Sequence, residues 1–130
     1  MKRFSCFFIW IFVLTSILPA QEREVKLKVV QTSDIHGNYY PYDFIRREAT
    51  GSLARVHALV QKEREAYGKN LILLDNGDIL QGQPTAYYYN YIDTVAPHLA
   101  AEMMNFMGYN AGNMGNHDVE TGRTVFDRWA

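Results

Sequence analysis

A short apolar run in the middle of the chain constrains the fold most. Leu71 to Leu74 are four aliphatic residues in succession, and the run stops at Asn76-Gly77. Such a run is typical of a parallel strand buried on both faces, because a surface strand alternates apolar and polar residues. Asp78 follows directly, so we expect its carboxylate just beyond the carboxyl end of the strand, where open α/β sheets place ligands. Taken alone, Asn-Gly-Asp is also an ordinary turn.

The segments before this run predict the rest of a βαβ unit. Val25 to Val30 alternates valine and leucine with lysine, the pattern of a first strand. Ser52 is a helix cap and Gly68 a helix end. The residues between them place an apolar stripe at helical spacing: Leu53, Val56, Leu59 and Val60. Two strands joined by a helix predict an α/β fold with a parallel sheet and a right-handed crossover.

Helical segments are expected after the buried strand. Pro84 can begin one that carries four tyrosines, for which packing is the commoner use and a wall for a flat ligand the alternative. Thr94 caps another, closed by Gly108, whose buried side is expected to hold Leu99, Met103, Phe106 and Met107. His57 and His98 are expected in solvent. Tyr109 to Met114 is a weak strand, and Thr124 to Trp129 a helix.

The first twenty residues differ from the rest. Lys2 and Arg3 precede an apolar core at Phe7 to Leu18, and Ala20 offers a small residue before a cleavage point. The core is shorter than the roughly 20 residues that a membrane-spanning helix needs. We therefore predict a signal peptide at residues 1–20 and export to the periplasm, cell envelope or extracellular space, with no stable membrane insertion after cleavage. An uncleaved anchor is the alternative.

Charge and cysteine content exclude some partners. The net charge is −1, which leaves no basic field for nucleic acid or an anionic membrane. The single cysteine, Cys6, lies within the predicted signal peptide, so the mature chain is expected to have no disulfide.

Three polar clusters follow three predicted strands. Asp34-Ile35-His36-Gly37 follows the first, Gly77-Asp78 the second and Gly115-Asn116-His117-Asp118 the third. Each has a plain alternative as a turn, but the carboxyl ends of parallel strands meet at one edge. Four of these residues offer the oxygen and imidazole donors that suit Mn²⁺, Zn²⁺ or iron: Asp34, His36, Asp78 and Asn116.

On these motifs the chain resembles the calcineurin-like metallophosphoesterases, and among them the secreted 5'-nucleotidase and 2',3'-cyclic-nucleotide phosphodiesterase branch. The resemblance is carried by Ser33 to Gly37, Asn76 to Gly82 and Met114 to Asp118, with Gly122 after them. It implies an α/β sandwich of parallel strands and crossover helices, with metal ligands at the carboxyl ends of the strands. It also implies two divalent ions.

The resemblance implies a role for each site residue. Asp34 and His36 bind the first ion, Asp78 bridges both, and Asn116 binds the second. His117 is not a ligand but neutralises phosphoryl oxygens or protonates the leaving group. The carboxylate that orients it is usually an Asp three places on, where this chain has Glu120, one methylene longer.

The family completes its site with Gly-His and Gly-His-x-His motifs, which the sequence lacks. We therefore expect residues 21–130 to be the incomplete amino-terminal part of a metallophosphoesterase domain, inactive alone. The expected reaction of the whole enzyme is hydrolysis of a nucleotide phosphoester by water that two metal ions activate. A non-catalytic metal- or ligand-binding domain and a nuclease of the same family are the alternatives.

Overall fold

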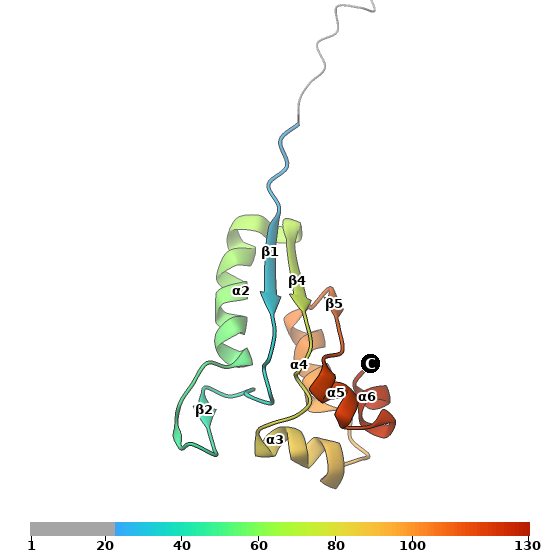
Figure 1. The fold of residues 1–130 in the computed structure, drawn as a ribbon. Coiled ribbons are helices and arrows are strands. Elements are labelled where there is room, and N and C mark those ends of the chain that lie inside the picture. Colours follow the sequence, from blue (N-terminus) through green and yellow to red (C-terminus); the bar gives the residue numbers. More distant parts are fainter. Residues whose placement is uncertain (1–22) are drawn as a thin grey trace, which may run out of the picture.

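The computed structural model describes residues 23–130, and the predicted signal peptide lies outside them. Three parallel strands form the sheet in the order β1-β4-β5: β1 at Lys28–Thr32, β4 at Leu71–Asp75 and β5 at Ala111–Gly112 (Figure 1). β1 and β4 are paired along their whole length, from Lys28 with Leu71 to Thr32 with Asp75. The predicted α/β fold and parallel sheet are confirmed.

Helix α2, Leu53–Tyr67, connects β1 to β4, and a 3-10 turn, η1 at Gly68–Asn70, follows it. The Ser52 hydroxyl accepts a hydrogen bond from the backbone N–H of Arg55, and Gly68 ends the helix, as the sequence predicts. Leu53 and Val60 are buried, but Leu59 is half-exposed and was wrongly placed on the buried stripe.

The core forms on one face of β4. Leu71, Leu73 and Asp75 are buried there, whereas Ile72 and Leu74, which point to the other face, are only partly buried. The apolar run is therefore a central strand that α2 and α4 cover on one side, and the prediction that it is buried on both faces is wrong for the described residues. Its core neighbours include Leu53, Val60, Ile79, Leu80, Ala100, Met104 and Met107.

The segment between β1 and α2 contains a small antiparallel hairpin, β2 at Tyr42–Asp43 and β3 at Glu48–Ala49. Asp43 stabilises its turn, because its Oδ1 accepts the backbone N–H groups of Ile45 and Arg46 at 2.8 and 2.9 Å. β1 itself begins at Lys28, later than predicted, and Val25 and Leu27 are exposed.

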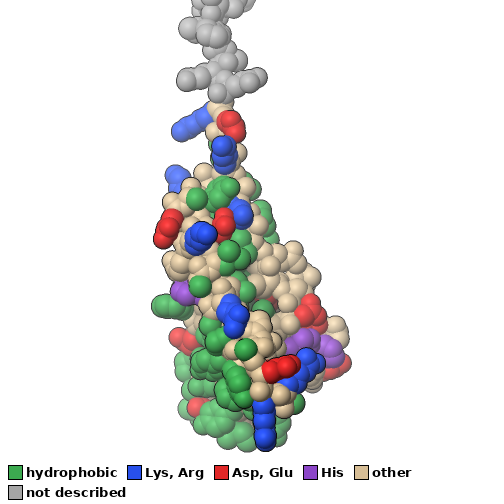
Figure 2. All heavy atoms as spheres, turned by 90° about the vertical axis from the view of Figure 1, so that its left-hand side faces the viewer, with side chains coloured by type: hydrophobic (Ala, Val, Ile, Leu, Met, Phe, Trp, Pro, Cys, Tyr) green, Lys and Arg blue, Asp and Glu red, His purple; other side chains and the backbone are tan. Residues whose placement is uncertain are grey.

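The tyrosine segment forms α3 at Pro84–Tyr87 and a π-helical turn, η2 at Tyr88–Ile92. Tyr87, Tyr88 and Tyr91 are about half-exposed, so the favoured role in core packing is wrong for them. Apolar side chains of this end, where β2 and α3 lie, gather on the lower surface in Figure 2, with Lys and Arg side chains beside them.

Helix α4 spans Leu99–Met107, so it begins five residues after the predicted cap, Thr94. His98 is its N-cap, because its Nδ1 accepts the backbone N–H of Ala100 at 3.2 Å. His98 is fully buried, which contradicts the prediction that it lies in solvent, and Phe106 is 79% exposed rather than buried.

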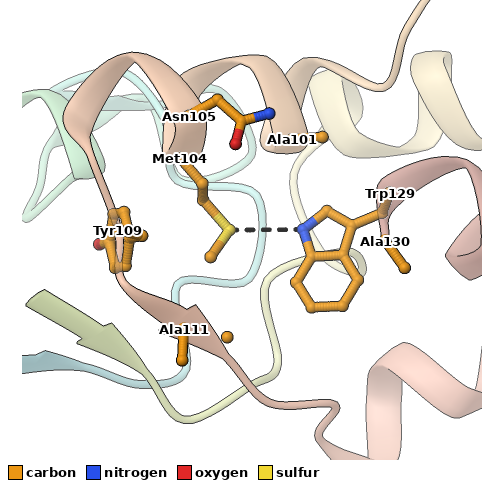
Figure 3. A pocket seen from close by; sticks show the side chains of 8 residues that line it. Ala101, Met104, Asn105, Tyr109, Ala111, Trp129 and Ala130 are labelled. Carbon is orange, nitrogen blue, oxygen red and sulfur yellow. Dashed lines mark hydrogen bonds between the residues drawn. The ribbon is translucent and has the colours of Figure 1, made fainter.

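Two short helices, α5 at Asn116–Glu120 and α6 at Arg123–Trp129, follow β5. The Trp129 indole N–H donates to the Met104 sulfur at 3.4 Å, across a hollow of about 260 Å³ between α4, β5 and α6 (Figure 3). Residues 23–130 contain no helix with the length and hydropathy that a bilayer crossing requires.

Candidate metal centre

The site lies where the chain leaves β1 and β4. Backbone pairing continues past the strands: Asn76 N–H donates to Thr32 O at 2.8 Å, Asp34 N–H to Gly77 O at 3.0 Å and His36 N–H to Asp78 O at 2.8 Å. This pairing holds the Asp34-His36 loop beside the Gly77-Asp78 loop. The first two polar clusters are thereby brought together by main-chain hydrogen bonds, as parallel strand ends predict.

Three predicted ligands have left-handed backbone conformations. Asp34, His36 and Asp78 have φ of 55°, 49° and 61°, and the only other non-glycine residue with positive φ among the described residues is Arg47, in the hairpin. Each such conformation costs on the order of 1 kcal/mol for a side chain other than glycine. The presence of three such residues at one site indicates that the surrounding contacts hold their side chains in place.

The second and third clusters interlock through glycine. A Cβ on Gly77, whose φ is 98°, would collide with the backbone of Gly115, and a Cβ on Gly115 would collide with the Asp78 carboxylate. The Gly-Asp and Gly-Asn-His-Asp motifs therefore need glycine because their backbones approach each other closely.

His36, Asp78 and His117 come together in this arrangement. One ligand atom of each lies within 4.8 Å of the others, and the two imidazole rings have centroids 5.3 Å apart. Asp78 is 9% exposed, and its Oδ1 accepts the backbone N–H of His117 at 2.9 Å. Two imidazoles and one carboxylate at this spacing match the donor set of a transition-metal site.

The orientation of His36 is set by a carbonyl group. Its Nδ1 lies 3.1 Å from the backbone oxygen of Gln81. Because a carbonyl only accepts, Nδ1 carries the proton and Nε2 keeps its lone pair free for a ligand bond. This second hydrogen bond is the usual device that fixes a metal-binding histidine.

Asp34 and Asn116 lie outside the group of three. The Asp34 side chain is 64% exposed, and its Oδ1 lies 3.9 Å from His36 Nε2. Asn116 is exposed at the first residue of α5, directly before His117. Asp34 thus lies at the edge of the cluster, and the predicted roles of Asp34 and Asn116 as ligands stay predictions.

His117 and Glu120 form a pair across one turn of α5. His117 Nδ1 donates to Glu120 Oε2 at 2.9 Å, so the longer Glu side chain reaches the imidazole. This hydrogen bond is the main cause that raises the pKa of His117 and lowers the pKa of Glu120. Gln81 Nε2 donates to the same oxygen at 3.4 Å.

Sequence reasoning quoted Asp118 within its motif but gave it no role. Its carboxylate is fully buried and accepts the backbone N–H groups of four residues: Asp78, Ile79, Leu80 and Gly115. The available signal was its position, three residues after a helix-capping glycine, where an acidic residue can cap the N-terminus.

Asp75 was also missed. It is 4% exposed at the end of β4, where it accepts hydrogen bonds from the Thr32 hydroxyl at 2.6 Å and Gly77 N–H at 3.0 Å. Burial raises its pKa. Its contacts place it beneath the turn that presents Asp78.

Comparison with known proteins places this geometry in context. A family model for calcineurin-like phosphoesterases matches residues 27–130. A trifunctional nucleotide phosphoesterase, YfkN of Bacillus subtilis, is 36% identical over 90% of this chain and 9% of its own length. A 2',3'-cyclic-nucleotide 2'-phosphodiesterase/3'-nucleotidase of Yersinia enterocolitica is 34% identical over 79% of this chain and 16% of its own.

A solved structure gives the same result for the fold. The crystal structure of the YfkN calcineurin-like phosphoesterase superimposes with a TM-score of 0.71 at 35% identity, covering 82% of this chain and 34% of that one. The chain thus spans less than a fifth of the length of the two curated relatives.

Proposed function

The chain belongs to the calcineurin-like phosphoesterase family, and we propose that it supplies the first part of the catalytic site of a metal-dependent hydrolase of nucleotide phosphoesters. The observation that carries this proposal is the convergence of His36, Asp78 and His117 within 4.8 Å, from three segments of the chain. Both curated relatives described above are named for nucleotide phosphoester chemistry, which supports this substrate class.

The residues fit divalent metal ions. His36 presents Nε2 because Gln81 O holds its Nδ1, and Asp78 keeps one carboxylate oxygen beyond the bond from His117 N–H. Asp34 and His36 would hold a first ion, Asp78 would bridge, and Asn116 would contribute to a second. Two bound ions of Mn, Zn or Fe would supply charge to neutralise the phosphoryl group and acidity to activate water.

His117 is assigned to the transferring group rather than to an ion. Its Nδ1 is occupied by Glu120 at 2.9 Å, which leaves Nε2 for a phosphoryl oxygen or the leaving oxygen. Glu120 raises the pKa of the imidazole and thereby favours its protonated form, which can donate a proton and offset developing negative charge. No protein nucleophile is required.

We further propose that residues 21–130 are the first part of this domain and that further donors come from elsewhere in the full-length protein. Among the described residues, three donors serve the first ion, but only Asp78 and Asn116 serve the second. The second ion would then be held weakly by this part alone. The signal peptide at residues 1–20 and export belong to the same proposal.

The experiment is a metal-dependent hydrolysis assay of the full-length protein. With Mn²⁺ or Zn²⁺ we expect phosphate or mononucleotide release from 2',3'-cyclic AMP, 3'-AMP or 5'-AMP. Asp78→Ala should abolish this release, and Asp127→Ala is its matched control, because Asp127 is an exposed carboxylate on α6 paired with Arg123. Its turnover should equal that of the unmodified protein. Bound metal without hydrolysis of any substrate would favour the alternative, a non-catalytic binding domain.

A further inference from the structure

The Asp118 side chain is a buried charge that no part of the proposed mechanism uses. Its Oδ2 accepts Asp78 N–H at 2.7 Å and Gly115 N–H at 2.9 Å. Its Oδ1 accepts Ile79 N–H at 2.9 Å and Leu80 N–H at 2.7 Å. A fully buried carboxylate is costly unless its oxygens are satisfied, and here four donors from two segments satisfy them.

These contacts join two of the three polar clusters. Three donors belong to the loop that presents Asp78, and the fourth belongs to the glycine that precedes α5. The reverse contact also exists, because Asp78 Oδ1 accepts His117 N–H at 2.9 Å. Asp118 therefore fixes Asp78 and His117 relative to each other through the backbone.

The Asp78 loop needs such a support. Asp78 has φ of 61°, and its neighbour Gly77 has φ of 98°, so neither residue is held by a regular element. Four hydrogen bonds to one carboxylate hold this conformation against its strain, because hydrogen bonds to a charged group are among the strongest in proteins.

We propose that Asp118 is a positioning residue for the metal centre: it sets the Asp78 carboxylate where it can share an ion with His36, beside the His117 imidazole. The proposal rests on the proposed function for its meaning, since it assumes that Asp78 binds metal. It adds a residue that touches neither ion nor substrate.

The test compares Asp118→Asn with Asp43→Asn in the full-length protein. Asp43 is a matched control, because it is also a buried carboxylate that accepts two backbone N–H groups, in the hairpin. Mn²⁺ affinity is measured by titration without substrate, alongside the melting temperature without metal. Asp118→Asn should weaken Mn²⁺ binding about 10- to 100-fold, the usual loss for a partner of a ligand. Asp43→Asn should lower the melting temperature without changing Mn²⁺ affinity.

Asp118→Glu and amide exchange complete the test. Glu keeps the charge but displaces the oxygens by a methylene, so it should fold and still bind Mn²⁺ less tightly. In Asp118→Asn the amides of Asp78 to Leu80 and Gly115 should lose exchange protection, a result that does not depend on metal or activity.

Unchanged Mn²⁺ affinity in either folded Asp118 variant would overturn the proposal. So would an equal loss in Asp43→Asn, which would indicate a general effect of stability, or failure of both Asp118 variants to fold. If the unmodified protein binds no Mn²⁺, the proposed function fails, and amide exchange still decides whether Asp118 holds the loop.

Discussion

Two histidines at either end of the Asp78-Leu80 segment show opposite behaviour. His117 is partly exposed, and its hydrogen bond to the Glu120 carboxylate raises its pKa. His98 is fully buried, and burial lowers its pKa to about 4. The difference comes from the charge of the hydrogen-bond partner and the access of water, because His117 bonds a carboxylate whereas His98 bonds neutral groups away from solvent.

The His98 side is a closed chain of neutral hydrogen bonds. His98 Nδ1 accepts Ala100 N–H, so Nε2 carries the proton and donates to Asn90 Oδ1 at 2.8 Å. Asn90 Nδ2 then donates to Leu80 O at 2.7 Å. Both ring nitrogens of His98 are used, which stabilises one neutral tautomer and leaves neither nitrogen free for chemistry.

The His117 side leaves a ring nitrogen and a carboxylate oxygen free beside His36. Proximity to the Asp78-Leu80 loop therefore does not define a functional histidine. A functional histidine has one ring nitrogen held by a hydrogen bond and the other free to bind a ligand, as in His36 and His117.

The largest effect should come from Asp78→Ala. This variant removes the carboxylate that accepts the His117 N–H, and it leaves the contacts of His98 unchanged. We expect loss of bound metal and of measurable hydrolysis, because Asp78 is the proposed bridge between the ions. The Leu80-Asn90-His98 chain should persist, since it uses only the Leu80 carbonyl. Metal analysis, turnover and amide exchange measure this together. Retention of both ions would contradict the bridging role.

His117→Asn should lower turnover by about 100-fold while metal content stays within twofold of the unmodified protein. The imidazole is assigned to the phosphoryl group and not to an ion. The cluster of His36, Asp78 and His117 also permits the opposite assignment, in which His117 is a ligand. Loss of one ion per molecule in this variant would establish that opposite assignment.

Acid should destabilise the fold through His98. Its pKa is about 4 in the folded protein against 6.5 ordinarily, so the unfolded chain binds the proton first as the pH falls. The stabilisation is complete above pH 6.5 and is lost between 6.5 and about 4. Between pH 7 and 5 the free energy of unfolding should fall by about 2 kcal/mol from this group.

Denaturant titrations of the unmodified protein and His98→Gln across this range separate the effect from other groups. The variant should be less stable at pH 7 but should lose about 2 kcal/mol less on acidification. Parallel losses in both proteins would show that His98 does not carry the acid sensitivity.

Local sequence signals predicted much of the fold. The apolar run Leu71 to Leu74, the cap Ser52 and the end Gly68 are local signals, and all three predicted their elements. The glycine-rich motifs pointed to one edge of the sheet because parallel strands share a direction.

Long-range packing could not be predicted in the same way. His98 was placed in solvent because it is polar and near a helix start, but the partner that buries it, Asn90, lies in a π-helical turn that no local pattern indicated. Phe106 fits the apolar stripe of α4, yet it faces outward beside His57, with ring centroids 5.3 Å apart. Asp118 took its role from four amides, three of them about forty residues away, which spacing alone does not show.

The smallest effect should come from changing the partner of His117 while keeping its ring. Glu120→Gln retains a hydrogen-bond acceptor for Nδ1 but removes the charge, and we expect about tenfold lower turnover, at the low end for a residue that orients a catalytic group. Glu120→Asp retains the charge on a side chain one methylene shorter. If charge is what matters, Asp should restore most of the turnover, and if the 2.9 Å contact is what matters, Asp should be as slow as Gln. Gln81→Ala is the control, because its side chain makes only a 3.4 Å bond to Glu120 while its backbone carbonyl still holds His36. Metal affinity should be unchanged in all three variants, and a loss of metal in Glu120→Gln would mean that Glu120 acts on an ion rather than on the imidazole.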